Sequence, residues 1–386
     1  MVNIILLGLV SFFTDLSTEM VYPLIPLYLT AAFGATPVII GIIEGIAESA
    51  SSLLKVFSGY ISDRFQKKKL LAFSGYATGL LYKLVLLIAG SWFGVLVARV
   101  VDRLGKGVRT APRDVLVSES ADLNALGKSF GIHKALDMAG AALGILITYF
   151  LLLGSNGSFA YKKIFILSAI PAVLGLCMFF FIKEKKTERP PKQRERFWKN
   201  VKGIDGQLKL YLAVVCIFTL GNSSNAFLLL KAKATGFDNT SVVLLYFVYN
   251  IVASLLSIPF GRLSDKVGRK GLLVTGYAVF AACYVGFALA GSQMQMIMVF
   301  VLYGAYTAMV AGVERAFVAE IAPPALRGTM LGLHSTVTGV ALLPASVIAG
   351  LLWNSLGTSA PFLFGASLSL IAAIILACFM KKRPAV

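Results

Sequence analysis

GYISDRFQKKKLL, residues 59–71, returns as GRLSDKVGRKGLL at residues 261–273. A second pair of segments, SESADLNALGKSFGIH at residues 118–133 and AEIAPPALRGTMLGLH at residues 319–334, is separated by almost the same interval. Two independent matches, at offsets of 202 and 201 residues, indicate that one unit has been duplicated. We therefore expect two related halves in tandem.

The composition places both halves in a membrane. Of the 386 residues, 58% are hydrophobic and only 14% are charged, with a mean hydropathy of +0.81. A water-soluble protein could not cover its surface with so few polar residues. Apolar stretches of about 20 residues, each long enough to cross a bilayer as a helix, recur along the chain, which predicts an all-α membrane protein. The expected helices are residues 3–30, 37–59, 69–90, 92–117, 128–153, 161–182, 208–230, 240–261, 271–291, 293–320, 328–354 and 358–380.

A net charge of +18 would indicate a nucleic-acid partner in a soluble protein, but here the basic residues gather in alternate loops between the expected helices. By the positive-inside rule, the basic loops face the cytoplasm. We therefore expect a multi-pass protein of the cytoplasmic (inner) membrane with both termini in the cytoplasm, and no nucleic-acid partner.

One long hydrophilic stretch, KEKKTERPPKQRERFWKNVK at residues 183–202, separates the halves. Its dense charge and paired prolines predict a linker and not a domain. The expected organisation is an N-terminal six-helix bundle at residues 1–182, a cytoplasmic linker at 183–207 and a C-terminal six-helix bundle at 208–386.

The repeated loop carries a motif of glycine, acid and basic residues. The first copy has Gly59, Asp63 and Arg64, with Gln66 in place of a second glycine, and the second copy has Gly261, Asp265, Lys266, Gly268 and Arg269. We expect the glycines at the start of each copy to let the chain bend back. The acids can pair with a neighbouring base such as Lys266 or face a helix end, so the motif is expected to latch one conformation.

With this motif the chain resembles the major facilitator superfamily, and in particular its twelve-helix proton-linked branch. Arg103 followed by Gly107, and Pro323-Pro324 preceding Arg327-Gly328, are similar to further motifs of that family. The resemblance implies two pseudo-symmetric six-helix bundles and secondary transport. One departure is DMAGAALG at residues 137–144, which lacks the proline that drug antiporters of the family often carry there.

Ionisable residues inside the expected helices are the candidate coupling groups. A charge at the bilayer centre costs at least about 2.5–3.5 kcal/mol on insertion scales, so each one calls for a partner, a water-filled cavity or a function. A carboxyl group at such depth can load and release a proton. The proton-coupling candidates are Asp15, Glu19, Glu48, Asp102 and Asp137.

The expected helix at residues 92–117 is unusually basic. Arg103 is the leading candidate for a central residue, either binding an anionic group of the substrate or holding the coupling acid ionised, and Lys106 shares its stripe. Asp102 has the alternative role of neutralising a neighbouring arginine. Arg109 and Arg113 are expected near the cytoplasmic end, as snorkelling or loop-bracing groups.

The second half offers neutral polar and aromatic groups within its helices, which suit recognition of an organic solute. The substrate-binding candidates there are Asn222, Asn225, Tyr246, Tyr249, Asn250, Tyr303 and Tyr306, and the same region holds Glu314 and Arg315. The alternative for any one of them is a hydrogen bond that only joins helices. His133 and His334 are repeat mates with an expected structural role, and no metal ligand set emerges.

These features predict a secondary active transporter that moves a small organic solute by alternating access, coupled to protons and directed towards efflux as a drug or metabolite antiporter. Proton-coupled uptake of an organic anion is the alternative, and a non-transporting receptor or scaffold is the alternative of another class. No nucleotide-binding motif or nucleophile–base pair is visible, so we expect no enzyme activity and no cofactor besides the proton gradient. The expected partners are the solute and the bilayer, with the chain as a monomer.

Overall fold

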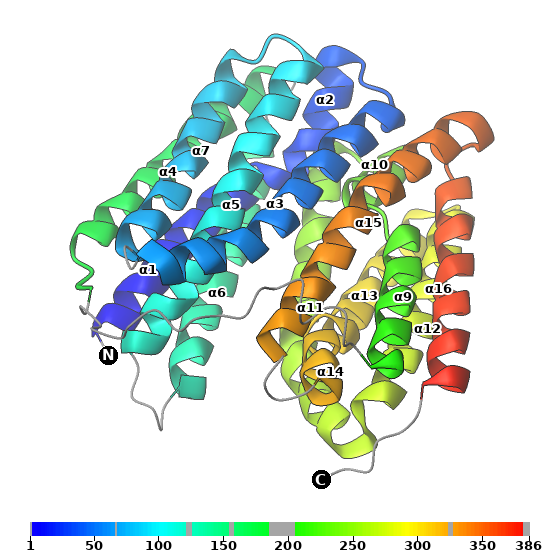
Figure 1. Ribbon diagram of the computed structural model, residues 1–386. Coiled ribbons are helices and arrows are strands. Elements are labelled where there is room, and N and C mark those ends of the chain that lie inside the picture. Colours follow the sequence, from blue (N-terminus) through cyan, green and yellow to red (C-terminus); the bar gives the residue numbers. More distant parts are fainter. Residues whose placement is uncertain are drawn as a thin grey trace. The chain divides into compact units, whose positions relative to one another are not determined.

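The computed structural model describes residues 2–65, 68–120, 126–153, 158–184, 205–322 and 327–380. Within these ranges every regular element is helical, which confirms the predicted all-α class (Figure 1). The first half contains α1 (Val2–Glu19), η1 (Tyr22–Leu24), α2 (Ile25–Phe33), α3 (Pro37–Phe65), α4 (Lys68–Ile88), α5 (Trp92–Ser120), α6 (Leu126–Leu152) and α7 (Ser158–Phe180). The second half contains α9 (Gly206–Gly221), α10 (Ala226–Ala234), α11 (Asn239–Val267), α12 (Arg269–Leu289), α13 (Gln293–Val310), α14 (Val313–Ile321), α15 (Arg327–Leu356) and α16 (Ala360–Phe379).

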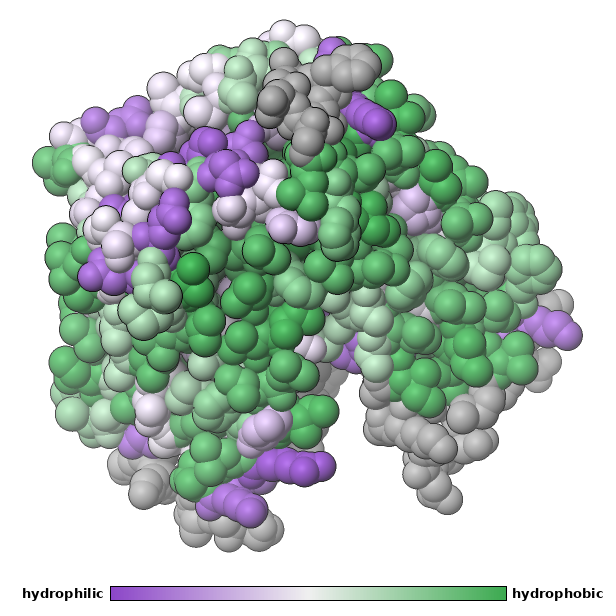
Figure 2. Space-filling model, turned by 180° about the vertical axis from the view of Figure 1, so that it is seen from behind, coloured by the Kyte–Doolittle hydropathy of each residue, from purple (hydrophilic) through white to green (hydrophobic). Residues whose placement is uncertain are grey.

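Membrane-spanning capacity follows the expected helices closely. Among the described residues, eleven segments are long and apolar enough to cross a bilayer. The twelfth expected span is α5, which has 29 residues but carries a dense set of charges. Large hydrophobic side chains such as Leu255 and Ile258 of α11 are 70% and 65% exposed, as lipid-facing residues should be. Hydrophobic residues cover much of the face drawn in Figure 2.

Two compact units are distinguished by which segments lie close together. The first comprises Met1–Ala35, Ile46–Lys192 and Asn239–Leu244, and the second comprises Thr36–Gly45, Gln193–Asp238 and Leu245–Val386. The linker expected at residues 183–207 lies mostly outside the described residues, and the bundle boundaries at 182 and 208 stay predictions.

Three helices that were expected to be continuous are broken, which corrects the ranges 3–30, 208–230 and 293–320. The first breaks at η1, where Pro23 and Pro26 cannot supply a backbone N–H to the preceding turn. The second stops at Gly221 and resumes at Ala226 after an Asn-Ser-Ser-Asn run, whose side chains compete for backbone hydrogen bonds. The third breaks between Val310 and Val313.

The glycines that open the repeated loop motif do not make the turn, so this expectation was wrong. Gly59 lies inside α3 and Gly261 lies inside α11, each several residues before its helix ends. The turn into α12 is made at Gly268, whose φ of +88° is a conformation that a side chain would strain. In the first copy, residues 66–67 lie outside the described part of the chain.

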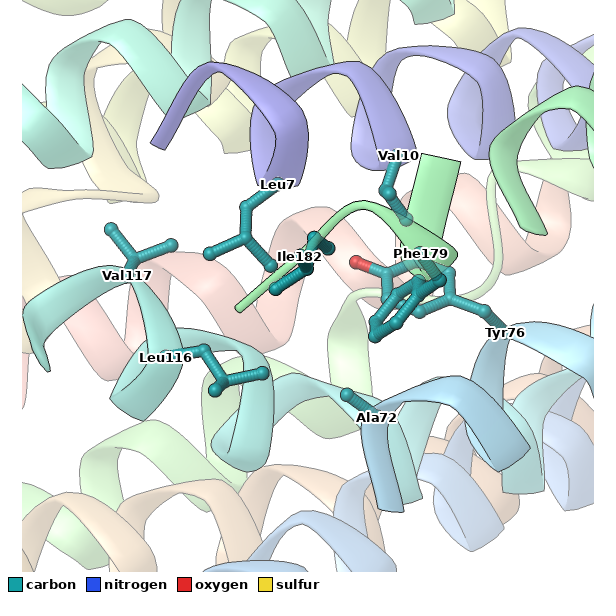
Figure 3. Close-up of a cluster of buried hydrophobic side chains, with 8 residues drawn as sticks. All are labelled: Leu7, Val10, Ala72, Tyr76, Leu116, Val117, Phe179 and Ile182. Carbon is teal, nitrogen blue, oxygen red and sulfur yellow. The ribbon is translucent and has the colours of Figure 1, made fainter. Parts of the chain in front are cut away.

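In the first unit, α1 packs against α6 and α7, and α4 packs against α5. Figure 3 shows part of the resulting core, in which Leu7 and Val10 of α1 meet Tyr76 of α4 and Phe179 of α7. The rings of Tyr76 and Phe179 have centroids 5.3 Å apart. This apolar packing holds the helices that carry the buried charges in fixed register.

In the second unit, α12 packs against α13 and α16, and α9 packs against α15 and α16. Aromatic rings fill much of the space between these helices. The ring of Phe218 on α9 stacks on Tyr277 of α12 with centroids 3.9 Å apart, and Phe280 lies 4.8 Å from Tyr306 of α13. The polar groups described below are set into this aromatic surrounding.

Candidate functional site

Two glycines on α6 bring that helix into close contact with α1. A β-carbon added at Gly140 would overlap the backbone carbonyl of Phe12, and one added at Gly144 would overlap that of Leu16. Small residues four apart allow helix backbones to approach this closely in membranes. Asp137 lies one turn before Gly140 on α6, and Asp15 lies on the stretch of α1 that these glycines contact.

The consequence is that two of the predicted coupling acids meet. The carboxyl groups of Asp15 and Asp137 lie within hydrogen-bonding reach of each other. An ionised carboxylate can only accept hydrogen bonds, so a bond between the two requires one proton. The Asp15–Asp137 pair, named so from here on, is therefore an arrangement that can hold a single proton between two helices.

Basic groups surround this pair. Lys134, one turn before Asp137 on α6, places its Nζ 2.7 Å from the Asp137 carboxylate. Lys106 and Arg109 of α5 lie close enough to interact electrostatically with Asp15. Loss of the shared proton would thus leave two carboxylates beside several cations, and its return would alter their balance of charge.

A second charged group lies along α5 and joins it to α3. An Nη2 atom of Arg103 is 2.7 Å from a carboxylate oxygen of Glu48, and Asp102 lies 3.9 Å from the same guanidinium. Asp102 is also 3.6 Å from Arg99. The charge of Arg103 is thus shared by two acids, and its role as a central residue stays a prediction. Lys106, one turn further along, interacts electrostatically with both Glu48 and Asp15 and so connects the two groups.

The aromatic ring of Tyr22 belongs to the same group. It lies in η1, at the break after α1, and the guanidinium carbons of Arg99 and Arg103 are 5.1 and 5.6 Å from its centroid. Cation–π contact of this kind stabilises a buried guanidinium. The break that the prolines produce therefore supplies a wall of the charged site.

Two buried bases were not anticipated: Arg109 was expected elsewhere, and Lys83 was not among the candidates. Arg109 is only 5% exposed and its guanidinium lies 4.7 Å from the Tyr76 ring, so its expected placement as a snorkelling group was wrong. Lys83 of α4 is 1% exposed, donates to the carbonyl of Gly79 at 3.0 Å and interacts electrostatically with Asp102. The sequence signal for Lys83 is a single lysine in the middle of an apolar stretch.

In the second unit, hydrogen bonds join most of the predicted recognition residues into two groups, which meet where the rings of Tyr303 and Tyr306 have centroids 5.2 Å apart; together they are called the tyrosine network. Asn225, at the start of α10, donates to the hydroxyl of Tyr249 at 3.1 Å and accepts from that of Tyr303 at 2.9 Å. Asn222 donates to the hydroxyl of Tyr306 at 3.3 Å. Both asparagines lie where the helix is interrupted, so the break turns their side chains towards the tyrosines of α11 and α13.

The remaining candidates are Tyr246, Asn250 and Glu19. Tyr246 contacts Tyr249, with ring centroids 5.3 Å apart. Asn250 donates to the backbone carbonyl of Tyr246 in its own helix at 2.8 Å, which is a local bond. Glu19 is the last residue of α1.

The repeat-mate histidines have different surroundings. The Nε2 atom of His133 is 3.0 Å from the hydroxyl of Ser11 on α1. His334 stacks on Tyr211 of α9, and its Nε2 atom lies 3.8 Å from the Glu314 carboxylate. A structural role remains a prediction for His133, whereas His334 adjoins an acid.

The second copy of the loop motif forms a small ion-pair network. Arg269 lies 3.2 Å from Asp265 and 2.7 Å from Glu320 of α14. The expected pairing of Asp265 with Lys266 is replaced by pairing with Arg269, the first residue of α12, across the turn at Gly268. The backbone of the first copy is helical up to Phe65, but the side chains of Asp63 and Arg64 are not among those that the structure describes.

No metal centre is built from the residues that the structure describes, because no group of three or more histidine, cysteine, aspartate or glutamate side chains could hold an ion. The four cysteines are free thiols.

The sequence of the chain is similar to a family model and to individual proteins. The family model of the Major Facilitator Superfamily matches residues 7–230 and 210–386. An uncharacterized MFS-type transporter of Methanocaldococcus jannaschii is 39% identical over 380 residues, which cover 97% of this chain and 94% of that protein. The multidrug resistance protein MdtG of Escherichia coli is 23% identical over 99% of this chain and 95% of its own.

Solved structures show the same fold at low identity. The nucleoside transporter NupG superposes with a TM-score of 0.77 at 14% identity, over 99% of this chain and all of its own. A D-xylose-proton symporter superposes with a TM-score of 0.76 at 17% identity, over 98% of this chain and 97% of its own.

Proposed function

This chain belongs to the major facilitator superfamily, and from that premise we propose that it exports a small organic solute in exchange for protons. It is a multi-pass membrane transporter and not an enzyme, and it moves small solutes by alternating access. The observation that carries the proton coupling is the Asp15–Asp137 pair.

The Asp15–Asp137 pair suits a proton carrier for two reasons. Its carboxyl groups can share one proton, and each comes from a different helix, so holding the proton joins α1 to α6. Lys106 links the pair electrostatically to Glu48 and the Arg103 group on α5. Loading or releasing the proton would therefore change the charge balance of the groups proposed to face the solute, which is what coupling requires.

The proposed direction is outward. It is supported by the similarity to MdtG, whose name describes resistance to drugs, over nearly the whole chain. The energy source is the proton gradient, with no bound cofactor. The proposed location is the cytoplasmic (inner) membrane with both termini in the cytoplasm, following the basic loops, and the proposed working form is a monomer without a nucleic-acid partner.

A second candidate is proton-coupled uptake of an organic anion. The observation that favours it is the charge of α5, where Arg99, Arg103, Lys106 and Arg109 accompany a single acid, Asp102, over the same stretch. Arginine binds carboxylates through two parallel hydrogen bonds, so this stretch could receive an anionic group.

Reconstituted proteoliposomes separate these candidates. With an inward-directed proton gradient imposed, and with ethidium as a cationic and benzoate as an anionic test solute, export and uptake predict solute flow in opposite directions. A pH-sensitive dye reports whether protons move with the solute. Proton-independent flow of every solute tested would refute the coupling.

The site assignment has its own test. We expect Asp15→Asn, Asp137→Asn and Arg103→Gln each to abolish gradient-driven transport while the purified proteins remain folded and monodisperse. Asp114→Asn is the matched control, since Asp114 is an acid of α5 that pairs with Arg113 at 2.8 Å and is 45% exposed. Wild-type transport by all three variants would refute the assignment.

A further inference from the structure

Glu314, a partly buried acid of the second unit whose side chain is 16% exposed, has no role in the coupling site described above. Glu314 lies in the first turn of α14, just after the break that ends α13. One carboxylate oxygen accepts a 2.8 Å hydrogen bond from the hydroxyl of Tyr277 on α12, and the other lies 3.8 Å from the Nε2 atom of His334 on α15. Three helices therefore hold this carboxylate in place.

Most of the groups packed against Glu314 are uncharged hydroxyls or an imidazole. The titratable groups that face it are Tyr277 from α12, His334 from α15, and the hydroxyls of Tyr211 on α9 and Tyr306 on α13. Within the described residues, no lysine or arginine forms an ion pair with it. Arg315, the next residue in the chain, interacts electrostatically with Glu314, although its own side chain is exposed. A largely buried carboxylate without a directly paired cation is stabilised by a counter-charge that a ligand brings.

Glu314 lines a cavity of about 190 Å³. The cavity walls are partly apolar, with Phe218 of α9, Val310 of α13 and Leu342 of α15, and partly polar. We call this cavity the Glu314 pocket; its other lining residues are Thr219, Asn222, Tyr306, Thr307, Ala311 and Thr338.

Two buried polar atoms beside the carboxylate lack partners. The hydroxyl of Thr338, which lines the pocket, and the Nε2 atom of His334, a residue 7% exposed, make no hydrogen bond within the described part of the chain. Buried polar groups are nearly always hydrogen-bonded in native proteins, so such orphan atoms call for a missing partner. Thr338 lines the pocket together with Glu314, so a donor group bound in the pocket can satisfy the Thr338 hydroxyl oxygen.

The chemistry of the walls selects the class of that ligand. An ammonium group has three N–H donors, which suit the Glu314 carboxylate and the Thr338 hydroxyl oxygen. The faces of aromatic rings attract cations, and Phe218 and Tyr306 line the pocket with ring centroids 6.3 Å apart. A bare metal ion would need a shell of oxygen ligands, whereas much of this wall is carbon.

We infer that the Glu314 pocket binds the protonated amino group of the transported solute, an organic amine with an apolar or aromatic body. The inference rests on the proposed export of an organic solute and names its chemical class. Asn222 takes part in both places, since it lines the pocket and bonds the hydroxyl of Tyr306 in the tyrosine network.

Binding by the purified full-length protein in detergent tests this inference without any gradient. The probes are benzylamine, its neutral analogue benzyl alcohol and the anion benzoate, each titrated by thermal shift and by isothermal calorimetry at constant ionic strength. We expect benzylamine to stabilise the protein and to bind at least about tenfold more tightly than either analogue, as a charge-assisted hydrogen bond predicts.

Substitutions locate the binding. Glu314→Gln keeps the size of the side chain and its ability to accept from Tyr277, and is expected to weaken benzylamine binding by about tenfold or more. Thr338→Val, which is nearly isosteric, is expected to weaken it several-fold. The control Asp205→Asn removes a negative charge from an exposed position just before α9 and should bind as the wild type does.

Each outcome decides the question. Equal binding of the amine, alcohol and acid by the wild type overturns the inference even if Glu314→Gln fails to fold. Unchanged benzylamine binding in Glu314→Gln overturns the inference as well. If sodium chloride stabilises the wild type more than potassium chloride does, and Glu314→Gln loses this difference, the pocket binds an inorganic cation and the inference is overturned. If the protein binds benzylamine but shows no proton-driven transport, the proposed function is refuted and the amine site stands.

Discussion

Glu48 of α3 and Arg103 of α5 form a 2.7 Å ion pair in which the arginine is almost fully buried. Asp102, adjacent to Arg103 in the chain, lies 3.9 Å from the same guanidinium. The charge of Arg103 is therefore balanced by acids from two helices, and a solute that reaches it must compete with Glu48.

The Glu48–Arg103 contact should be measurable as a coupling free energy. Glu48→Gln and Arg103→Gln are each expected to lower the unfolding free energy. The double variant should lose less than the sum of the two single losses, and the difference, which is the coupling free energy, should be about 1–3 kcal/mol. Denaturant unfolding in detergent measures all four proteins. The exposed pair Asp265–Arg269 is the control, where the coupling should stay below about 1 kcal/mol. Equal coupling at the two sites would contradict the buried character of the first.

Close packing of α6 on α1 is expected to depend on the absence of a side chain at Gly140. Gly140→Ala places a methyl group against the backbone carbonyl of Phe12, which cannot move aside as a flexible side chain would. We expect a loss of about 1–3 kcal/mol in stability and a loss of proton coupling, because Asp137 moves away from Asp15. Thermal unfolding and proteoliposome proton flux check both effects. Gly79→Ala is the control, since nothing lies within 4 Å of its added methyl group; matching behaviour of the two variants would argue against the packing role.

The tyrosine network is expected to depend on the amide of Asn225. Asn225→Leu removes the acceptor of Tyr303 and the donor to Tyr249, leaving two buried hydroxyls without these partners. We expect transport affinity to fall at least tenfold with a smaller change in maximal rate, measured in proteoliposomes with the solute identified by binding. Asn250→Leu, which breaks only a bond within its own helix, should change affinity little. If the two variants lose affinity equally, the network is structural and does not recognise the solute.

The ion pairs of the second loop motif should control the rate of conformational exchange. Arg269→Gln removes both the Asp265 and the Glu320 contact, and is expected to slow transport several-fold while binding of benzylamine in detergent stays unchanged. Arg269→Lys should restore part of the rate, since lysine is a point charge without the two-pronged geometry of arginine. Arg262→Gln, an exposed neighbour on α11, serves as the control. A wild-type transport rate in Arg269→Gln would show that this copy of the motif does not latch a conformation.

Local features of the chain were predictable because their physical causes are local. Hydropathy over about 20 residues fixes a membrane span, and the repeat at residues 59–71 and 261–273 shows duplication without any structure. The loop turn was misplaced at Gly261, because several glycines stand close together there and only the backbone angle of Gly268 identifies the one that bends the chain.

The sequence by itself determined that acids and bases lie at membrane depth, since a charge within an apolar stretch is visible in one dimension and its cost in lipid is known. It could not determine which of them meet. Asp15 reaches Asp137 because Gly140 and Gly144 let α1 and α6 pack closely. Glu314 becomes a candidate binding residue only in the folded chain, where it contacts Tyr277 and His334 and lines a cavity. Contacts between distant segments depend on how helices pack, and packing is a property of the folded chain alone.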